Sequence, residues 1–562
     1  MFWLLLAALI LANGSIETLT AAGETQTWDE GIHISAGYAY LTRGDFRWNQ
    51  EHPPLAKLMS ALPLLFLRPD LPVTAPSWQK LDETQLGIDF LYCNRVRPDS
   101  ILFAARAMTI VLSMLFLVAL AWLVRRRFGT AAALTAASFC AFDPNLIAHA
   151  RYVTTDFPLT VFFFLASFLW MEYLSDTRWK NVVPAAAAFA LALVTKFSAI
   201  LLLPALVLLY VIRWRQQTRP FPWRRTLVTA SVFALFTLGT VAVVYWPETL
   251  RCWRGGVPAL SASIERGNAV AEVLYQAGRW LHLPEHAFLT GLGRVAAHNT
   301  GGHSSYLLGM RSDEDWWYYF PVVFAVKSTI AALICTTLLL VAGVRALWKA
   351  GPVVLTALRN APFFWFGLLI PPLLYFAFSM TSAINIGMRH ILPIYPFLYV
   401  AAAVLLVRAA RPRFFRYAVP LLVALQIGEC ASIAPDYLAF FNVLAGGPDH
   451  GPQYLLDSNI DWGQDIKKLK RWLAAHGTDQ ATILYFGNAQ LDSYGIRASD
   501  FPAALDEKGW DSLSGYAVAS VTPLYGVYVP LDSLARLRLR QPVAKVGWSL
   551  YVYDFGKSHT AK

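Results

Sequence analysis

Eleven apolar segments separated by short polar stretches constrain the fold of this chain more than any other feature. A helix needs about 20 predominantly apolar residues to cross a bilayer. The chain is 56% hydrophobic and only 15% charged, whereas soluble domains carry about a quarter charged residues. The sequence therefore predicts an α-helical polytopic membrane protein with about eleven transmembrane helices. The segments are Phe2–Ala12, Ile101–Val124, Ala131–Ala148, Pro158–Leu174, Val182–Val194, Ala199–Ile212, Leu227–Trp246, Phe320–Val344, Phe363–Phe378, Ile391–Val407 and Ala418–Ile433.

Five loops between these segments are rich in Lys and Arg, and alternation puts all five on one side of the bilayer. Because basic loops stay on the cytoplasmic side, we expect that side to be the cytoplasm. Large loops 13–100 and 247–317 then lie outside, together with the tail from residue 434. This topology accounts for the net charge of +11, which therefore does not indicate nucleic-acid binding. The basic loops are 125–127, 178–180, 213–225, 345–359 and 408–416.

The composition changes after residue 433. Runs with the alternation of half-buried strands flank a stretch with helical periodicity. We therefore predict a small extracytoplasmic α/β domain over 434–562, following a transmembrane domain over 1–433. The predicted strands lie in 481–487, 515–521, 526–531 and 549–555, and the predicted helix lies in 469–477.

Two further features of the outer segments have structural interpretations. Asp457, Asp461 and Asp465 recur at intervals of four, which we interpret as a loop and a solvated helix face, with a binding face as the alternative. Five scattered cysteines without a CxxC pair argue against a zinc site and a dense disulfide framework. Cys93 and Cys252 share the outer side, where a disulfide between them could form.

An adjacent acidic pair, Asp29 and Glu30, follows the first apolar segment in the sequence TWDEGIH. The predicted topology puts this pair on the outer face, near the membrane surface. His33 follows Asp29 at i+4, so a helix here would bring both side chains to one side. The alternative is structural, with Asp29 as the N-cap of that helix. Further along, the sequence EHPPLAK contributes His52 and Lys57.

Three more ionisable residues lie at the outer membrane boundary. Arg151 and Asp156 occupy the short loop of HARYVTTDFPL, between the third and fourth apolar segments. Ionisable groups at such depth are costly, which makes them functional candidates. The alternative for Asp156 is a helix cap or a structural pair with Arg151. Lys196 lies in LVTKFSAIL between the fifth and sixth segments, and its alternative is a snorkelling lysine.

A basic pair, Arg389 and His390, begins the tenth segment on its outer side, in INIGMRHILP. Basic residues there run against the positive-inside rule and so require another reason. Carboxylates beside cations suit a reaction in which a hydroxyl attacks a phosphate-activated carbon. A carboxylate removes the hydroxyl proton, and cations stabilise the charge that develops on the leaving phosphate. A phosphate at a lipid boundary indicates a lipid carrier.

These motifs carry a family resemblance. TWDEGIHISAGYAYLTRGDFRWNQEHPPLAKL resembles the first outer loop of the protein O-mannosyltransferase family. It also resembles that of related bacterial transferases that use phospholipid-carried sugars, within the C-type superfamily of membrane glycosyltransferases. The Asp-Glu, His-Pro-Pro-Leu-x-Lys, Arg-Tyr-x-x-x-Asp, Thr-Lys-Phe and Gly-x-Arg-His-x-Leu-Pro elements match in order, over about the first 430 residues.

The resemblance implies an inverting enzyme of C-type fold whose donor is a polyprenyl phosphate carrying one sugar, often mannose. Asp29 matches the catalytic acidic residue proposed as general base, and Glu30 is its companion. Asp156 matches the second acidic residue of the site. The other matches are basic residues. Arg151 and Lys196 match residues that hold the donor phosphate, and His52 and Lys57 fall in the run that shapes the pocket. Arg389, with His390 next to it, matches a position near the carrier.

The resemblance leaves the acceptor open among a protein Ser/Thr, a glycan and a lipid. Loop 247–317 is too short for the β-trefoil domain of the eukaryotic enzymes, and the α/β tail is also not theirs. No cofactor is predicted. A divalent metal is compatible with two acidic positions, but no oxygen-rich cage is legible, and the resemblance implies that none is required.

Two other classes of function are alternatives to a glycosyltransferase of the bacterial inner membrane. A transporter or lipid flippase should carry its ionisable residues near the bilayer midplane, with discontinuous helices or repeats. This chain has them at one face and shows no internal repeat. A membrane-anchored binding module built around the tail would leave the acidic and basic residues near Asp29 unexplained.

Overall fold

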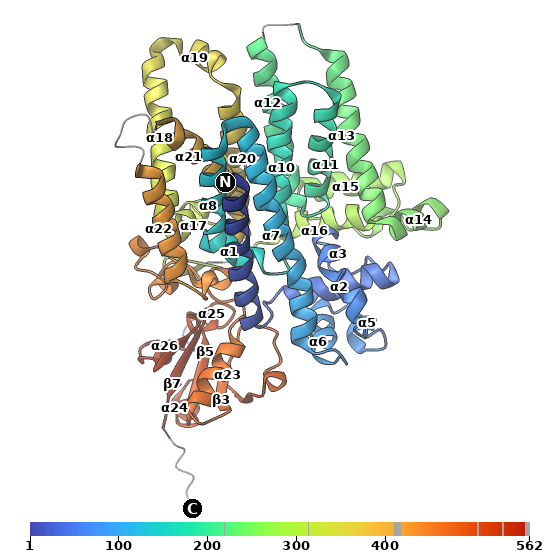
Figure 1. Ribbon diagram of the computed structural model, residues 1–562. Coiled ribbons are helices and arrows are strands. Elements are labelled where there is room, and N and C mark those ends of the chain that lie inside the picture. The colour runs from blue at the N-terminus through green and yellow to red at the C-terminus, as the bar shows by residue number, and fades with distance from the viewer. Residues whose placement is uncertain (218–219, 313, 410–416, 503–504, 531–532, 557–562) are drawn as a thin grey trace, which may run out of the picture.

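We describe a computed structural model of the chain. It describes all residues except 218–219, 313, 410–416, 503–504, 531–532 and 557–562. Most of the chain is helical, and a small sheet lies near the C-terminus (Figure 1). This arrangement confirms the predicted fold class of a polytopic helical protein with a small α/β domain at its C-terminal end.

Seven described helical segments are long and apolar enough to cross a membrane, or eight if a bent pair, α8 Thr130–Ala141 and α9 Pro144–Ala150, counts as one span. The pair bends by 66°. The predicted number of eleven is therefore not confirmed, because three further apolar helices are shorter: α11 Trp179–Leu193, α20 Phe363–Ser379 and α22 Ala418–Ser432. The seven are α1 Phe2–Gly23, α7 Pro98–Phe128, α10 Asp156–Ser175, η1 with α12 over Phe197–Gln217, α13 Trp223–Val244, α18 Ile330–Ala350, and η4 with α21 over Met388–Ala409.

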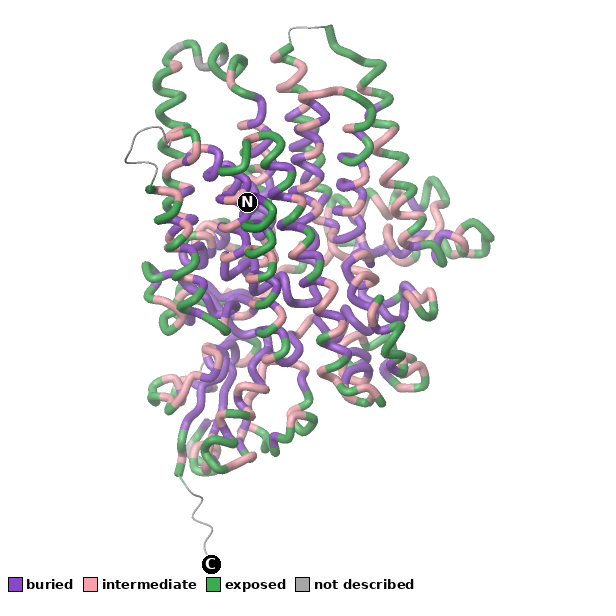
Figure 2. Tube along the Cα trace, in the orientation of Figure 1, coloured by how far each residue is buried: buried purple, intermediate pink, exposed green. Residues whose placement is uncertain are grey.

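Burial separates the central helices from the peripheral ones (Figure 2). In α10 and in the Met388–Ala409 segment, 78% of the most apolar window is buried, whereas in α13 only 6% is. A helix that is apolar all round and yet exposed is expected to face lipid. α10 and η4 are therefore at the centre of the bundle, and both carry predicted site residues.

Two ends of the bundle differ in what they carry (Figure 1). The connected ends of α12 and α13 lie at the top of the view, as do α18 and α19 Val354–Asn360, next to predicted cytoplasmic loops. The helices between α1 and α7 lie toward the opposite end, and so does the C-terminal sheet. These helices are α2 Glu30–Arg43, α3 Leu55–Ala61, α4 Leu64–Leu67, α5 Pro76–Lys80 and α6 Glu83–Tyr92.

Helix α2 is held against α3 and α6 by close backbone contacts. A Cβ atom on Gly87 would lie 2.7 Å from the carbonyl carbon of Gly31, and one on Gly37 would lie 2.2 Å from the carbonyl oxygen of Lys57. Only glycine allows the chains to approach this closely. The start of α2 is therefore fixed in position, together with the residue before it, Asp29.

The segment between α13 and α18 is also mainly helical. Within it, α16 closes one side of the central cavity described below. A short antiparallel hairpin follows α16. The elements are α14 Trp246–Arg254, α15 Ala269–Leu281, α16 Ala287–Gly301, β1 Ser305–Leu307, β2 Met310–Ser312 and α17 Tyr319–Lys327.

The C-terminal domain contains a five-stranded mixed sheet in the order β4-β3-β5-β7-β6. Strand β3 pairs in parallel with both β4 and β5, whereas β7 is antiparallel to β5 and β6. Helix α23 Ile466–Ala475 packs its apolar side on the sheet through Leu469 and Leu473. The other elements are β3 Gln480–Leu484, β4 Arg497–Asp500, α24 Glu507–Asp511, β5 Tyr516–Ser520, α25 Val521–Leu524, α26 Ala535–Arg538, β6 Ala544–Val546 and β7 Leu550–Asp554.

Two expectations for the outer segments are wrong, and one possible cysteine pairing does not form. Described residues 526–530 form a turn rather than the predicted strand, because Gly526 and Tyr528 both have positive φ. Asp461 and Asp465 are buried rather than solvated. Cys93 and Cys252 are free thiols, as are the other three cysteines.

Candidate active site

Four of the predicted residues form a chain of ion pairs at the centre of the molecule. Arg389 Nη1 lies 2.7 Å from Asp29 Oδ2 and 3.8 Å from Asp156 Oδ2. Lys196 Nζ lies 2.5 Å from Asp156 Oδ1. The cations and carboxylates therefore alternate in the order Lys196, Asp156, Arg389, Asp29. The Asp156 side chain is only 3% exposed and Asp29 is the most accessible, at 24%.

Each member of this chain comes from the end of a different element. Asp29 immediately precedes α2, but its side chain makes no capping hydrogen bond. The structure therefore does not support the alternative interpretation that the Asp29 side chain caps this helix. Asp156 opens α10, Lys196 lies in the break between α11 and η1, and Arg389 lies in η4. Asp156 pairs with Lys196 and Arg389 and not with Arg151, and Lys196 points inward rather than snorkelling.

The segment that carries Arg389 is held by the C-terminal domain. Asn459 Oδ1 accepts a hydrogen bond from the Met388 backbone N–H at 2.9 Å, and Ser458 Oγ donates to the Ile386 carbonyl at 2.7 Å. The guanidinium of Arg389 lies over the ring of Trp462, with its carbon 4.4 Å from the ring centroid. Such contacts fix the orientation of the guanidinium plane.

The ion-pair chain lines a cavity of about 970 Å³. Two buried nitrogens on lining residues, Arg389 Nε and His390 Nε2, have no hydrogen-bond partner among the described residues. Buried polar atoms usually have a hydrogen-bond partner, so these two nitrogens are exceptions to the rule. Seven lining residues were singled out by the sequence: Asp29, His33, His52, Asp156, Lys196, Arg389 and His390.

Two histidines face the same cavity from α2 and from the loop before α3. The rings of His33 and His52 meet edge to face, with centroids 5.4 Å apart. His33 Nδ1 lies 2.9 Å from the Val153 carbonyl oxygen, which requires the nitrogen to be the donor. Burial lowers the pKa of His33 to about 4 and the pKa of His52 well below its ordinary value. Both rings are therefore neutral hydrogen-bonding groups near pH 7.

Glu30 does not line the cavity. Its carboxylate is fully buried and accepts two hydrogen bonds from Arg106, at 2.8 and 2.6 Å. It also accepts the backbone N–H groups of Val153 and Thr27. Because successive residues at a helix start point in different directions, Asp29 faces the cavity while its neighbour Glu30 joins the first outer loop to α7 and to the loop before α10.

Arg151 and Lys57 also lie outside the cavity wall. Arg151 forms two hydrogen bonds with Glu24, at 2.9 and 2.8 Å, and both side chains are buried. Lys57 Nζ donates to the Tyr40 hydroxyl and to the carbonyls of Asn49 and His52. Burial lowers the pKa of Lys57 to about 7. The structure thus brings these two residues next to the cavity loops but not to the cavity itself.

The C-terminal domain supplies cavity residues that the motif analysis did not select. Asp457, Trp462, Phe486 and Tyr528 all line the cavity. Asp457 was considered only as part of an acidic run, and Tyr528 lay in a predicted strand. Both have positive φ, 57° and 63°, a conformation that is uncommon for any residue other than glycine and that the alternating run around Tyr528 does not indicate.

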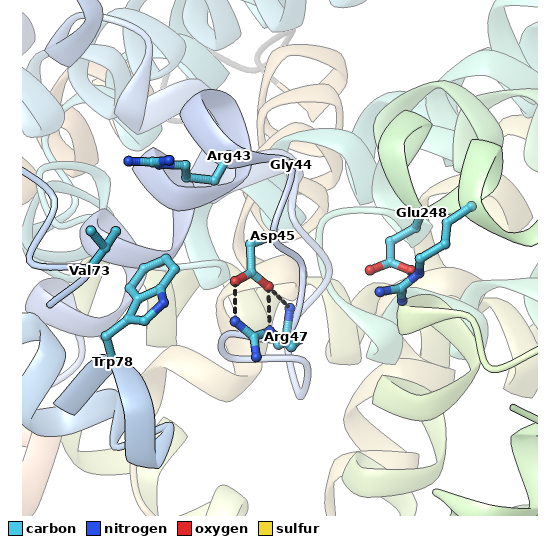
Figure 3. A pocket seen from close by; sticks show the side chains of 8 residues that line it. Arg43, Gly44, Asp45, Arg47, Val73, Trp78 and Glu248 are labelled. Carbon is cyan, nitrogen blue, oxygen red and sulfur yellow. Dashed lines mark hydrogen bonds and ion pairs between the residues drawn. The ribbon is translucent and has the colours of Figure 1, made fainter. Parts of the chain in front are cut away.

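A second pocket, of about 410 Å³, lies at the C-terminal end of α2 (Figure 3). Its charges are largely paired with one another. Arg47 binds Asp45 through two hydrogen bonds, at 2.9 and 2.6 Å, and Arg251 binds Glu248. No predicted site residue lines this pocket. Within the described part of the chain, no group of three or more His, Cys, Asp or Glu side chains is arranged to hold a metal ion.

Comparisons with known proteins point in the same direction as the motifs. Residues 98–246 match the sequence model of a family described as dolichyl-phosphate-mannose-protein mannosyltransferase. The match spans about a quarter of the chain and includes Arg151, Asp156 and Lys196. It confirms, for this segment, the family resemblance that the motifs indicated. A comparison with curated proteins found no match.

Solved structures similar to the whole chain include two of ArnT from Cupriavidus metallidurans, one bound to undecaprenyl phosphate and one in the apo state. Each is 16% identical and covers 98% of this chain and 97% of the other, with TM-scores of 0.44 and 0.43. Another is the Archaeoglobus fulgidus oligosaccharyltransferase in complex with Zn and sulfate. It is 12% identical and covers 95% of this chain and 70% of the other, with a TM-score of 0.45.

Proposed function

We propose that the protein is an inverting membrane glycosyltransferase. It moves a single sugar, mannose or another hexose, from a polyprenyl-phosphate donor to a hydroxyl acceptor on the extracytoplasmic side. The observation that carries this proposal is the alternating chain Lys196, Asp156, Arg389 and Asp29 in one cavity. A carboxylate for the acceptor and cations for the leaving phosphate are the two requirements of such a transfer.

The composition of the cavity wall supports a lipid-linked donor. Besides the charged residues, the cavity is lined by Ile200 and Phe378, which are 46% and 39% exposed. These side chains make part of the cavity wall apolar. A polyprenyl chain lying against them would keep its isoprene units on apolar surface while its phosphate reached Lys196. A water-soluble nucleotide sugar would gain nothing from such a wall.

The phosphate of the donor is assigned to Arg389 and Lys196. Both cations are already held by Asp156, so their positions are set before the donor binds. The side chain of His390 also lines this cavity. Preorganised cations stabilise developing charge without reorganisation during the reaction. The neutral His52 lines the same cavity.

Asp29 is assigned the role of general base. The acceptor oxygen forms a bond to the anomeric carbon while the bond from that carbon to the phosphate oxygen breaks. The electron pair of the broken bond leaves with the phosphate, and Asp29 takes the hydroxyl proton. Attack from the face opposite the phosphate inverts the anomeric configuration. A phosphate at Arg389 would compete for the guanidinium that now holds Asp29, which would free the carboxylate for the acceptor.

Glu30, Arg151 and Lys57 are proposed as positioning residues. Glu30 fixes the first outer loop through Arg106, Arg151 fixes the loop before α10 through Glu24, and Lys57 holds the loop that carries His52. We further propose a division into a catalytic domain, 1–433, and an outer domain, 434–562. In a bacterial cell the site would face away from the cytoplasm at the inner membrane, as the basic loops indicate.

The test is donor cleavage by the purified protein in detergent. Synthetic polyprenyl phosphates carrying labelled mannose, glucose or galactose are incubated with it, beside the corresponding nucleotide sugars. We expect release of polyprenyl phosphate from at least one carrier-linked sugar and no release of nucleotide from the nucleotide sugars. Cleavage of nucleotide sugars alone would contradict the proposal. Transport of an intact carrier-linked sugar across proteoliposomes without cleavage would favour a flippase.

A further inference from the structure

The cavity is lined by a second set of side chains, which are mainly aromatic, in contrast with the cations of the proposed phosphate site. Most of them come from the C-terminal domain, and none is used by the proposed chemistry. Parallel strands β3 and β5 lie side by side and end at Leu484 and Ser520. The residues at and just beyond these ends, Leu484 to Phe486 and Pro523, line the cavity. In sheets with parallel strands, ligands bind outside the carboxyl ends of the strands.

A row of three aromatic rings leads from this edge to the candidate base. The rings of Trp28 and Phe486 are stacked, with centroids 5.2 Å apart. Those of Phe486 and Tyr528 are also stacked, at 5.3 Å and an interplanar angle of 11°. Trp28 directly precedes Asp29 in the chain, and its carbonyl accepts a hydrogen bond from Asn488 Nδ2 at 3.2 Å. The row is therefore fixed relative to Asp29.

A carboxylate and a histidine lie at the far end of this row. The Tyr528 hydroxyl donates to Asp457 Oδ2 at 2.6 Å, and His303 Nδ1 lies 3.4 Å from the same hydroxyl. Asp457 and Tyr528 both adopt the left-handed backbone conformation. Such conformations cost free energy in non-glycine residues and concentrate at functional sites. Here they bring both side chains to the cavity, where a strand at 526–530 would not.

We propose that these residues form the acceptor subsite of the transferase and that the acceptor is a saccharide. The inference rests on the proposed function. The stacked row presents its ring edges and the outer faces of Trp28 and Tyr528 as apolar surface for the C–H faces of a sugar ring, while Asp457 and His303 offer hydrogen-bond acceptors and donors to its hydroxyls. The row would hold the acceptor in the cavity with a hydroxyl directed to Asp29.

The same part of the cavity wall favours a saccharide over a peptide as the acceptor. One common way to bind an extended peptide is to pair its backbone with a free strand edge. The two edge strands of the sheet are β4 and β6, and neither contributes a residue to the cavity. The wall instead consists of strand ends and side chains, which suit rings and hydroxyls, so the cavity does not offer this mode of peptide binding.

The test separates acceptor binding from donor cleavage. Saturation-transfer NMR with methyl glycosides of mannose, glucose and galactose is recorded on the full chain in nanodiscs, without donor. We expect binding of at least one glycoside to the wild type, weakened about tenfold by Asp457→Asn and by Phe486→Leu. Asp449→Asn is the matched control, because Asp449 is an exposed aspartate of the same region, paired with Lys545. It should bind as the wild type does.

A second readout keeps this inference distinct from the proposed function. Slow cleavage of the donor by water, without acceptor, should be the same in the Asp449→Asn control and the wild type. Loss of glycoside binding by Asp457→Asn and Phe486→Leu, with donor cleavage by the wild type and the control intact, supports the subsite. Equal binding by Asp457→Asn, Phe486→Leu and the control would overturn it, as would saturation transfer to a Ser/Thr-containing peptide and not to any glycoside. Absence of donor cleavage in the wild type would instead contradict the proposed function.

Discussion

Arg389 Nη1 lies 2.7 Å from Asp29 Oδ2, although the two residues are 360 positions apart in the chain. The contact joins the first outer loop to the start of the last long span. It also joins the candidate base to the candidate phosphate-binding cation. The predictions below follow from this pairing and from the contacts that hold it.

Replacing Arg389 by Lys should weaken donor use while leaving the fold intact. Lysine keeps the charge but presents a point charge in place of the fixed fork of donors that now faces Asp29 and Asp156. We expect kcat/KM for the carrier-linked donor to fall about a hundredfold. Steady-state kinetics at varied donor concentration would measure this. A variant with wild-type kcat/KM would remove Arg389 from the phosphate site.

Removing Lys196 should cost both stability and activity, and the stability should be recoverable. Lys196→Met leaves the buried Asp156 without its nearest cation, and breaking a buried pair costs about 3–5 kcal/mol. The double variant Lys196→Met with Asp156→Asn removes the orphaned charge. We expect it to regain most of the thermal stability in detergent but no activity. If the double variant were active, the pair would be structural only.

Replacing Glu30 by Gln distinguishes a positioning role of this carboxylate from a catalytic role. Glu30→Gln leaves Arg106 buried without its counter-charge, so we expect a loss of about 3–5 kcal/mol in the free energy of unfolding. Per molecule of folded enzyme, kcat should remain within about tenfold of the wild type. Asp479→Asn, at an exposed pair with Arg497, should leave the melting temperature unchanged. A stable Glu30→Gln protein without turnover would instead make Glu30 catalytic.

His33 should make the protein less stable in mild acid. Its pKa is about 4 in the folded state and about 6.5 when unfolded. Between these values the unfolded state binds more protons, so stability is full above pH 6.5 and is lost as pH falls toward 4. The loss at pH 5 is about 2 kcal/mol. Thermal melts at pH 7.5 and 5 should therefore differ less for His33→Asn than for the wild type, and an equal difference would contradict the buried neutral ring.

Sequence patterns could predict the helical fold and four residues that lie together, because each belongs to a motif at a membrane boundary. A topology that puts these residues on one side of the membrane is enough to predict that they lie together. The four are Asp29, Asp156, Lys196 and Arg389. The direction of a side chain was harder to predict. Adjacent Asp29 and Glu30 share a motif yet point to different neighbours, and only the packing of α7 decides between them.

The contribution of the C-terminal domain could not be predicted from local patterns. The run at 526–531 alternates like a strand, but at the described residues 526–530 tertiary contacts impose a turn that directs Tyr528 to Asp457. The number of transmembrane helices depends on how long each apolar helix is. Helices α8 and α9 show why this number is hard to predict from the sequence. One apolar run is divided by a 66° bend at Asp143, whose side chain caps α9.

The most direct test of the central claim is the Asp29→Asn variant, assayed with synthetic polyprenyl-phosphate mannose or whichever carrier-linked sugar the wild type cleaves. Asparagine keeps the shape of the side chain and cannot act as a base. Asp70→Asn, at an exposed pair with Arg95, serves as the control. We predict that Asp29→Asn folds, binds donor and loses turnover by a factor of about 10²–10⁴, whereas the control is fully active. Equal turnover by Asp29→Asn and the wild type would contradict the account.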